Sequence, residues 1–188
     1  MRRFAVVALL ITGSTPALAA QAAMVLPEKT LDAERGRLRD SVYVMRDTLS
    51  EVSASIARLQ RDFRTASAPV LVSRARTLAS DCAAARRRIP ATRAAIAGAP
   101  IRSKFALDQQ KRTATELARL ETELDRCLRE FGELSMPTKG EEVRGYGNRK
   151  AAPLQAQIRK YDAAIAGLFS VLEIPHRPLG ARRNPLAG

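Results

Sequence analysis

Residues 38–63 read LRDSVYVMRDTLSEVSASIARLQRDF, and this stretch decides the fold class. Its large apolar residues recur at alternating spacings of four and three positions, which places them on one side of an α-helix. The stripe contains, in order, Leu38, Val42, Met45, Leu49, Val52, Ile56, Leu59 and Phe63. It predicts a helix over about residues 30–66, roughly 55 Å long, a length typical of coiled-coil-like bundles.

Three later stretches show the same alternation and predict helices over residues 69–97, 104–135 and 152–173. Pro69 suits the first turn of the second helix, and Ser103 is a suitable N-cap for the third. Pro90 lies inside the second stripe and is expected to kink that helix, because proline lacks an N–H and crowds the preceding turn.

No stretch alternates with period two, so the predicted fold class is all-α. We expect residues 28–173 to form an antiparallel bundle of three long coiled-coil-like helices plus a shorter fourth helix. Residues 137–150 contain one proline and three glycines and are expected to be a mobile loop. Residues 174–188, basic and rich in proline, are expected to form a disordered tail.

The positions of the two cysteines predict how the second and third helices align along their length. If Cys82 faces Cys127 in an antiparallel hairpin, every stripe residue of one helix lies level with a stripe residue of the other. An intramolecular disulfide would stabilise the fold by roughly 3–4 kcal/mol; two free buried thiols and an intermolecular bridge are the alternatives. In this register the start of the third helix, with Phe105 and Leu107, extends past the end of the second.

The first 22 residues, MRRFAVVALLITGSTPALAAQA, have the order of a secretory signal peptide. We expect a signal peptide over residues 1–19, with cleavage after Ala19 and with Ala22 as a second candidate site. The apolar run of residues 4–11 is much shorter than the roughly 20 residues of a membrane-spanning helix. An uncleaved membrane anchor is therefore the less favoured alternative, and the protein is expected to be periplasmic or secreted.

Few residues are of the types that carry catalysis or bind metals. The chain has a single histidine, His176, which falls in the tail, where we expect it to be solvated. This excludes catalytic triads that need histidine and metal sites that need several histidines. No phosphate-binding glycine loop, nucleophile elbow or EF-hand pattern occurs. We therefore expect no enzymatic activity, no cofactor and no metal site.

Carboxylates crowd the third predicted helix, but most have basic residues three or four positions away, which indicates a solvated, salt-bridged face. The expected pairs within this helix are Glu116 with Arg119, Asp125 with Arg129, and Arg126 with Glu130.

The chain carries 32 Lys+Arg against 19 Asp+Glu, a net charge of +13, and the excess is localised. Residues 68–102 hold +6 and residues 137–188 hold +5. The candidate anion-binding residues are Arg74, Arg76, Arg86, Arg87, Arg88, Arg93, Arg149, Lys150, Arg182 and Arg183. Such a cluster attracts anionic surfaces. The alternative is a compositional bias, because Arg outnumbers Lys by 26 to 6.

Two functions remain. The first is an exported, non-catalytic helical interaction protein of the bacterial envelope, an adaptor, scaffold or holdase-like bundle that binds another envelope protein or a second copy of itself. The second is a binding module for anionic polysaccharide or lipid headgroups that uses the basic residues given above. Nucleic acid is disfavoured as a partner, because no aromatic residues are interleaved with the arginines and the chain is expected to be exported.

Overall fold

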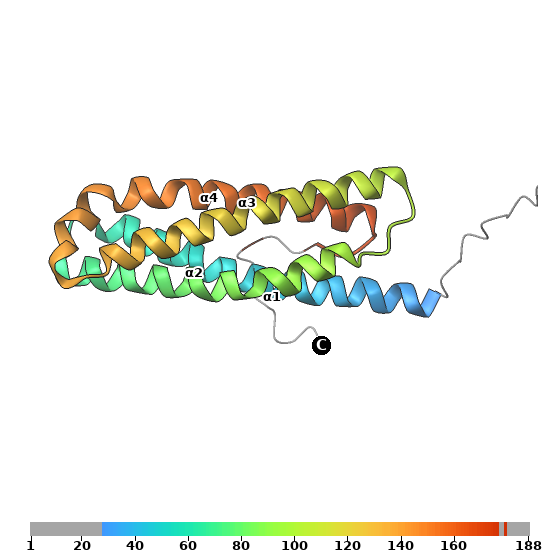
Figure 1. Ribbon diagram of the computed structural model, residues 1–188, viewed down its shortest axis with the longest axis horizontal. Helices are drawn as coiled ribbons and strands as arrows, with labels where there is room; N and C mark the ends of the chain where they lie inside the picture. Colours follow the sequence, from blue (N-terminus) through green and yellow to red (C-terminus); the bar gives the residue numbers. More distant parts are fainter. Residues whose placement is uncertain (1–27, 177–178, 180–188) are drawn as a thin grey trace, which may run out of the picture.

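The computed structural model describes residues 28–176 and residue 179, and these residues form a bundle of long antiparallel helices (Figure 1). The helices are α1 (Glu28–Asp62), α2 (Ala68–Ala97), α3 (Lys104–Leu134) and α4 (Gly140–Val171), with a 3-10 turn, η1 (Pro137–Lys139), before α4. The prediction of an all-α antiparallel bundle is confirmed. The predicted signal peptide and its cleavage sites lie outside the described residues.

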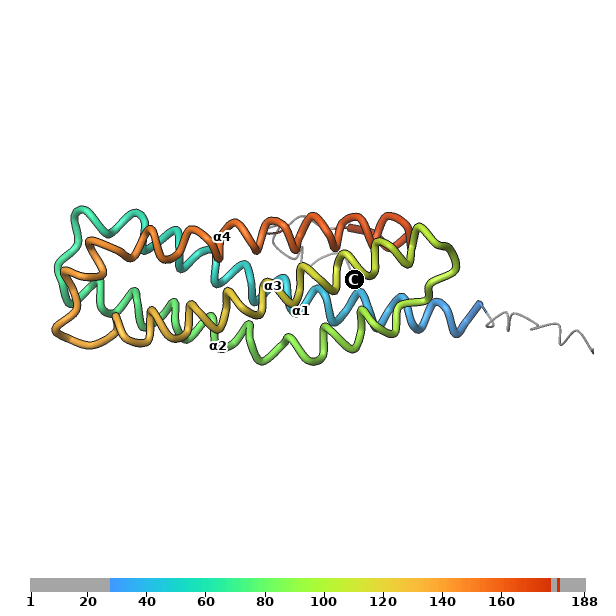
Figure 2. Tube along the Cα trace, turned by 45° about the horizontal axis from the view of Figure 1, so that its top comes forward, coloured from blue at the N-terminus to red at the C-terminus, as the bar shows by residue number. Residues whose placement is uncertain are grey.

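Consecutive helices run in opposite directions and pack side by side (Figure 2). α1 packs on α2, α2 on α3 and α3 on α4 along most of their lengths. α4 also contacts α1, less extensively, and reaches α2 across the core. The apolar stripe of α1 faces inward, because its residues from Leu38 to Leu59 are all buried. The stripes read from the sequence thus form one continuous core.

α4 has 32 residues, so the expectation of a shorter fourth helix over residues 152–173 is wrong. The segment expected to be a mobile loop, residues 137–150, forms η1 and the first turns of α4. Here the stripe continues through small residues, since Val143, Gly147 and Ala151 are all buried. Each glycine inside a helix destabilises that helix by about 1 kcal/mol relative to alanine. Burial of these residues against the bundle offsets this cost.

Arg144 ties the start of α4 to the end of α1. Its guanidinium donates hydrogen bonds to the carbonyl oxygens of Phe63, Arg64 and Ala66, at 3.0, 3.3 and 2.8 Å. These three carbonyls belong to the turn that follows Asp62, and the C-terminal end of a helix attracts positive charge. One side chain therefore satisfies three backbone groups and fixes where α4 begins.

The bounds of α2 and α3 agree closely with those predicted. The Ser103 hydroxyl caps α3 by accepting a hydrogen bond from the Ala106 N–H at 3.1 Å. α2 continues as an α-helix through Pro90 and ends at Gly98. The first turns of α3 extend past the end of α2 (Figure 1), and Phe105 there is 62% exposed. This agrees with the overhang expected from the cysteine register.

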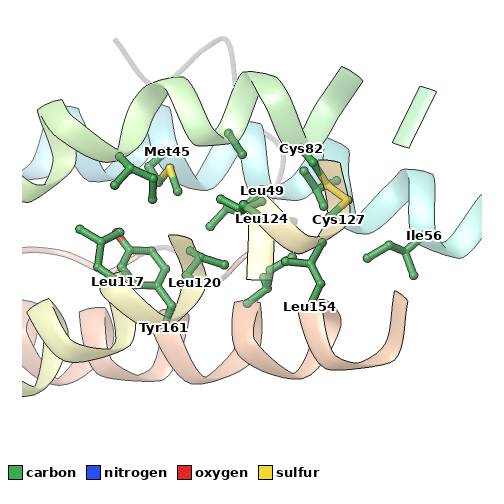
Figure 3. Packing of buried hydrophobic residues seen from close by; sticks show 14 of the residues in the cluster. Met45, Leu49, Ile56, Cys82, Leu117, Leu120, Leu124, Cys127, Leu154 and Tyr161 are labelled. Atoms are coloured by element: carbon green, nitrogen blue, oxygen red, sulfur yellow. A yellow bond between two sulfur atoms is a disulfide. The ribbon is translucent and has the colours of Figure 1, made fainter. Parts of the chain in front are cut away.

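Cys82 and Cys127 form a disulfide inside the seam between α2 and α3, with their Cα atoms 6.4 Å apart (Figure 3). Both cysteines are buried, and Leu49 of α1 and Leu124 of α3 lie close to the bond in this part of the core. The intramolecular bond predicted from the sequence is therefore present, and it sets the register between the two helices.

The chain reverses after α4 and returns to the bundle. Glu173 adopts a φ of 57°, the left-handed conformation that often follows a helix end. Ile174 is buried, and the Tyr43 hydroxyl of α1 donates a hydrogen bond of 2.7 Å to the Pro175 carbonyl. The expectation of a disordered tail over residues 174–188 is thus wrong for residues 174–176 and for Leu179, which packs against the core. The rest of that tail lies outside the described residues.

Reduction of the disulfide is expected to lower the free energy of unfolding by about 4 kcal/mol in the chain-entropy relation, because the bond joins residues separated by 45 positions. Urea unfolding followed by circular dichroism, with and without reductant, measures this difference. The double variant Cys82→Ala/Cys127→Ala is the control and should not respond to reductant. A loss below about 1 kcal/mol would contradict the assigned role of the bond.

Two glycines of α4 offer a matched test of the packing at its start. A Cβ on Gly140 would lie within 3.0 Å of the backbone of Ala68, whereas a Cβ on Gly145 would meet nothing within 4 Å. Gly140→Ala should lower the free energy of unfolding by about 1–3 kcal/mol through overpacking. Gly145→Ala should raise it by about 0.5–1 kcal/mol through helix propensity. Equal effects of the two changes in urea unfolding would show that α4 does not begin against α2.

Candidate functional site

Two of the six arginines of α2, Arg86 and Arg93, pair with carboxylates of α3. Arg86 forms ion pairs of 2.7 Å with Glu121 and 2.8 Å with Asp125. Arg93 also pairs with Glu121. The carboxylates of α3 therefore match only part of the positive charge that the sequence concentrates in this segment.

Two further α2 arginines have partners at the other end of the helix. Arg74 pairs with Asp62 of α1 at 2.7 Å, and Arg76 donates a hydrogen bond of 3.3 Å to the Ser135 carbonyl. Arg87 and Arg88 are exposed and form no ion pair with any residue that the structure describes. Arg76 is exposed as well, and its partner is a neutral carbonyl, so three of the six α2 candidates, Arg76, Arg87 and Arg88, present charge that no described carboxylate compensates.

The carboxylates of α3 follow a different pairing from the one expected. Of the three expected pairs only Glu116 with Arg119 forms, at 2.8 Å. Asp125 instead pairs with α2, as described above, and Glu130 lies 3.6 Å from Lys150 of α4. Arg126 pairs with Glu123 within α3. Side chains at the edges of a helix interface can reach the neighbouring helix, which the spacing along one helix does not reveal.

The C-terminal candidates are divided between two locations. Lys150 is partly buried beside α3, whereas Arg149 is exposed and its guanidinium carbon lies 5.1 Å from the centre of the Tyr146 ring. Arg182 and Arg183 lie outside the described residues. The structure therefore brings together no continuous basic surface from α2 and the C-terminal segment among the residues it describes.

A buried polar cluster between α1 and α4 was not found in the sequence. Arg46 is only 3% exposed, and its Nη2 lies 2.6 Å from Oδ1 of Asp162. The same α1–α4 register places Gln60 against Asn148, with a hydrogen bond of 3.0 Å. The sequence alone does not reveal this pair. Positions 46 and 162 are seen to lie level with each other only once the α1–α4 register is known.

Tyr161, next to Asp162, points its ring into the core (Figure 3). Its hydroxyl is buried and has no hydrogen-bond partner among the described residues. Burial raises the pKa of Tyr161 far above its ordinary value, although the charge of Arg46 opposes the shift. The hydroxyl therefore remains protonated at neutral and moderately alkaline pH.

His176 lies close to this cluster. The residue is exposed, in line with the expected solvation, but its ring also meets Phe169 of α4 edge-on, with the ring centres 6.3 Å apart. Partial burial, and next the charge of Arg46, lower the pKa of His176. The cluster consequently favours a neutral imidazole near neutral pH, which suits packing against an aromatic ring.

A cavity of about 270 Å³ opens between the end of α2 and the start of α3. It is lined mainly by apolar atoms, including those of Ile96, Ala114 and Leu117, with Arg93 and Lys111 at its border.

Within the described residues, no three His, Cys, Asp or Glu side chains are placed to hold a metal ion. Over the same residues, no helix has both the length and the apolar character needed to cross a bilayer.

Comparisons with protein-family models, with curated proteins and with solved structures found no match to this chain.

The polar cluster yields a prediction about stability. Tyr161→Phe removes a buried hydroxyl without a partner and should leave the free energy of unfolding unchanged or raise it by about 1 kcal/mol. Arg46→Met leaves the Asp162 carboxylate unpaired and should cost about 2–3 kcal/mol, toward the lower end for a buried pair because Asp162 is partly exposed.

The double variant Arg46→Met/Asp162→Leu is the control for this pair. It removes both charges and should recover most of the stability that Arg46→Met loses. Urea unfolding of the variants gives the comparison. A double variant as unstable as Arg46→Met would mean that the arginine acts through packing and not through its charge.

Proposed function

We propose that this chain is an exported, non-catalytic helical interaction protein of the bacterial envelope, an adaptor, scaffold or holdase-like bundle that binds another protein through a helical surface. The observation that carries the proposal is an exposed aromatic–cation pair on α4, Tyr146 with Arg149. Tyr146 is 51% exposed, and Arg149 stacks on its ring. Tyrosine and arginine are the residue types most enriched among the residues that dominate protein–protein binding energies.

Tyr146 and Arg149 lie on a part of α4 that is held firmly against the bundle. Tyr146 lies between Val143 and Gly147, both buried, and Arg144 anchors this part of α4 to the end of α1. Met136, 54% exposed, lies at the same end of the bundle, in the connection between α3 and η1. Side chains held on a rigid helix lose little conformational freedom when a partner binds.

Two further observations support the proposal. Arg86 and Arg93 of α2 pair with Glu121 and Asp125 of α3, so these charges join the two helices and are not left for an anionic ligand. The disulfide is typical of proteins in oxidising compartments outside the cytoplasm.

The second candidate, a module for anionic polymer or lipid headgroups on α2, is favoured by the exposed Arg87 and Arg88, with Arg76 about three turns away on the same helix. The neighbouring arginines Arg86 and Arg93 are neutralised by carboxylates of α3, as described above. Binding through this face should be lost when Arg86, Arg87 and Arg88 are replaced by Ala, and it should fall steeply with salt.

A photo-crosslinking amino acid at position 146 tests the first proposal in intact cells that produce the full chain. We expect a discrete covalent adduct at position 146 and none at position 44, where Val44 is exposed on α1. Arg149→Ala should reduce the adduct by about thirtyfold, the effect of losing about 2 kcal/mol at a central contact. An adduct of twice the chain mass would identify the partner as a second copy.

Arg159→Ala is the matched control, because Arg159 is exposed on the same helix and forms no ion pair with a described residue. It should leave the adduct unchanged, and so should an increase in salt to about 0.5 M, where exposed charges are largely screened. Equal adducts at positions 146 and 44, or equal losses for Arg149→Ala and Arg159→Ala, would contradict the proposal.

A further inference from the structure

The end of the bundle opposite η1 combines exposed apolar side chains with unpaired positive charge. This surface, which we name the α2–α3 tip, consists of Arg102, Lys104, Phe105, Leu107, Lys111 and Arg112. It includes the loop after α2 and the first turns of α3, at the right-hand end of the bundle in Figure 1.

The apolar part of the tip follows from the register of α2 and α3. Because α3 begins beyond the end of α2, its first turns have neighbours on one side only. Ala106 faces inward and is buried, whereas Phe105 is 62% exposed and Leu107 is 37% exposed. At about 100° per residue, Phe105 and Leu107 flank the outward face that carries Lys104, Lys111 and Arg112.

The charges of the tip have no carboxylate partner in the described part of the chain, unlike Arg74, Arg86 and Arg93 of α2. Arg102, Lys104, Lys111 and Arg112 are exposed and form no ion pair with any residue between 28 and 176. Asp108 is the one acidic residue among them, so residues 102–112 carry a net charge of +3. The tip thus combines free cations with a free aromatic ring.

The tip is also held in place. Ser103 caps α3, and the Gln110 side chain donates hydrogen bonds to the carbonyls of Ile96 and Ala97 at 2.7 and 3.2 Å. These contacts join the start of α3 to the last turn of α2. The exposed side chains are therefore presented on a fixed backbone.

We propose that the α2–α3 tip docks the bundle onto an anionic lipid surface. Lysine and arginine near an anionic bilayer are attracted by its negative surface potential, and aromatic and leucine side chains enter the boundary between headgroups and acyl chains. A soluble polyanion would satisfy the four cations but would leave Phe105 and Leu107 in water. α1 begins at this same end of the bundle (Figure 1).

Co-sedimentation of the full chain with vesicles tests the proposal. We expect binding to vesicles of 30% phosphatidylglycerol in phosphatidylcholine and little binding to phosphatidylcholine alone. Lys104→Ala/Lys111→Ala should weaken binding about thirtyfold, the effect of removing two charges near the surface. Arg87→Ala/Arg88→Ala removes the same charge from the side of α2 and should leave binding unchanged.

A second measurement locates the contact. The chain contains no tryptophan, so single tryptophans report on their own surroundings. The fluorescence of Phe105→Trp should shift to shorter wavelength with phosphatidylglycerol vesicles and be quenched by brominated acyl chains. Val44→Trp, on the exposed side of α1, should show neither change.

Three outcomes would overturn the proposal. The first is an equal loss of vesicle binding for the lysine and the arginine pairs, and the second is an equal response of the two tryptophans. The third is binding to a soluble polyanion such as heparin with no binding to the vesicles. Because the tested residues are distant in sequence from Tyr146 and Arg149, failure here leaves the protein-docking proposal untouched, and the reverse also holds.

Discussion

The register between α2 and α3 is the constraint on which the rest of this structure depends. The bond between Cys82 and Cys127 holds the two stripes level, so apolar residues meet apolar residues along the seam. The same alignment sets Arg86 between Glu121 and Asp125, one half-turn to either side of its level on α3. It also leaves the first turns of α3 with neighbours on one side only. Packing, charge pairing and the exposed end therefore share one geometric cause.

Much of the bundle could be predicted from the sequence, because large apolar residues at helical spacing mark α1, α2 and α3 clearly. The start of α4 could not be predicted in this way, because its buried face is formed by small residues, including Gly140, Gly147 and Ala151. When the helix that packs against them is not known, such residues indicate a loop. Gly140 is buried because α4 begins directly against Ala68 of α2. Here a contact between two helices outweighs the low helix propensity of glycine.

The candidate site was less accessible to sequence reasoning. The arginines of α2 are clustered in the sequence, yet their partners lie on other helices and become visible only when the helices are aligned. The Arg46–Asp162 pair depends on the α1–α4 register, for which the chain offers no marker comparable to the cysteines. The free charge of the described bundle lies in part where no cluster drew attention, around Lys104 and Lys111.

The disulfide also affects the unfolded chain. It closes a covalent loop over residues 82–127, which holds about half of α2 and most of α3, and leaves α1 and α4 outside this loop. In the oxidised protein, denaturation can separate α1 and α4 fully, whereas Cys82 and Cys127 stay in contact. The oxidised denatured ensemble is therefore more compact than the reduced one and exposes less new surface, so its dependence on urea concentration is shallower. Refolding under oxidising conditions starts from a chain in which one α2–α3 contact, between residues 45 positions apart, is already made.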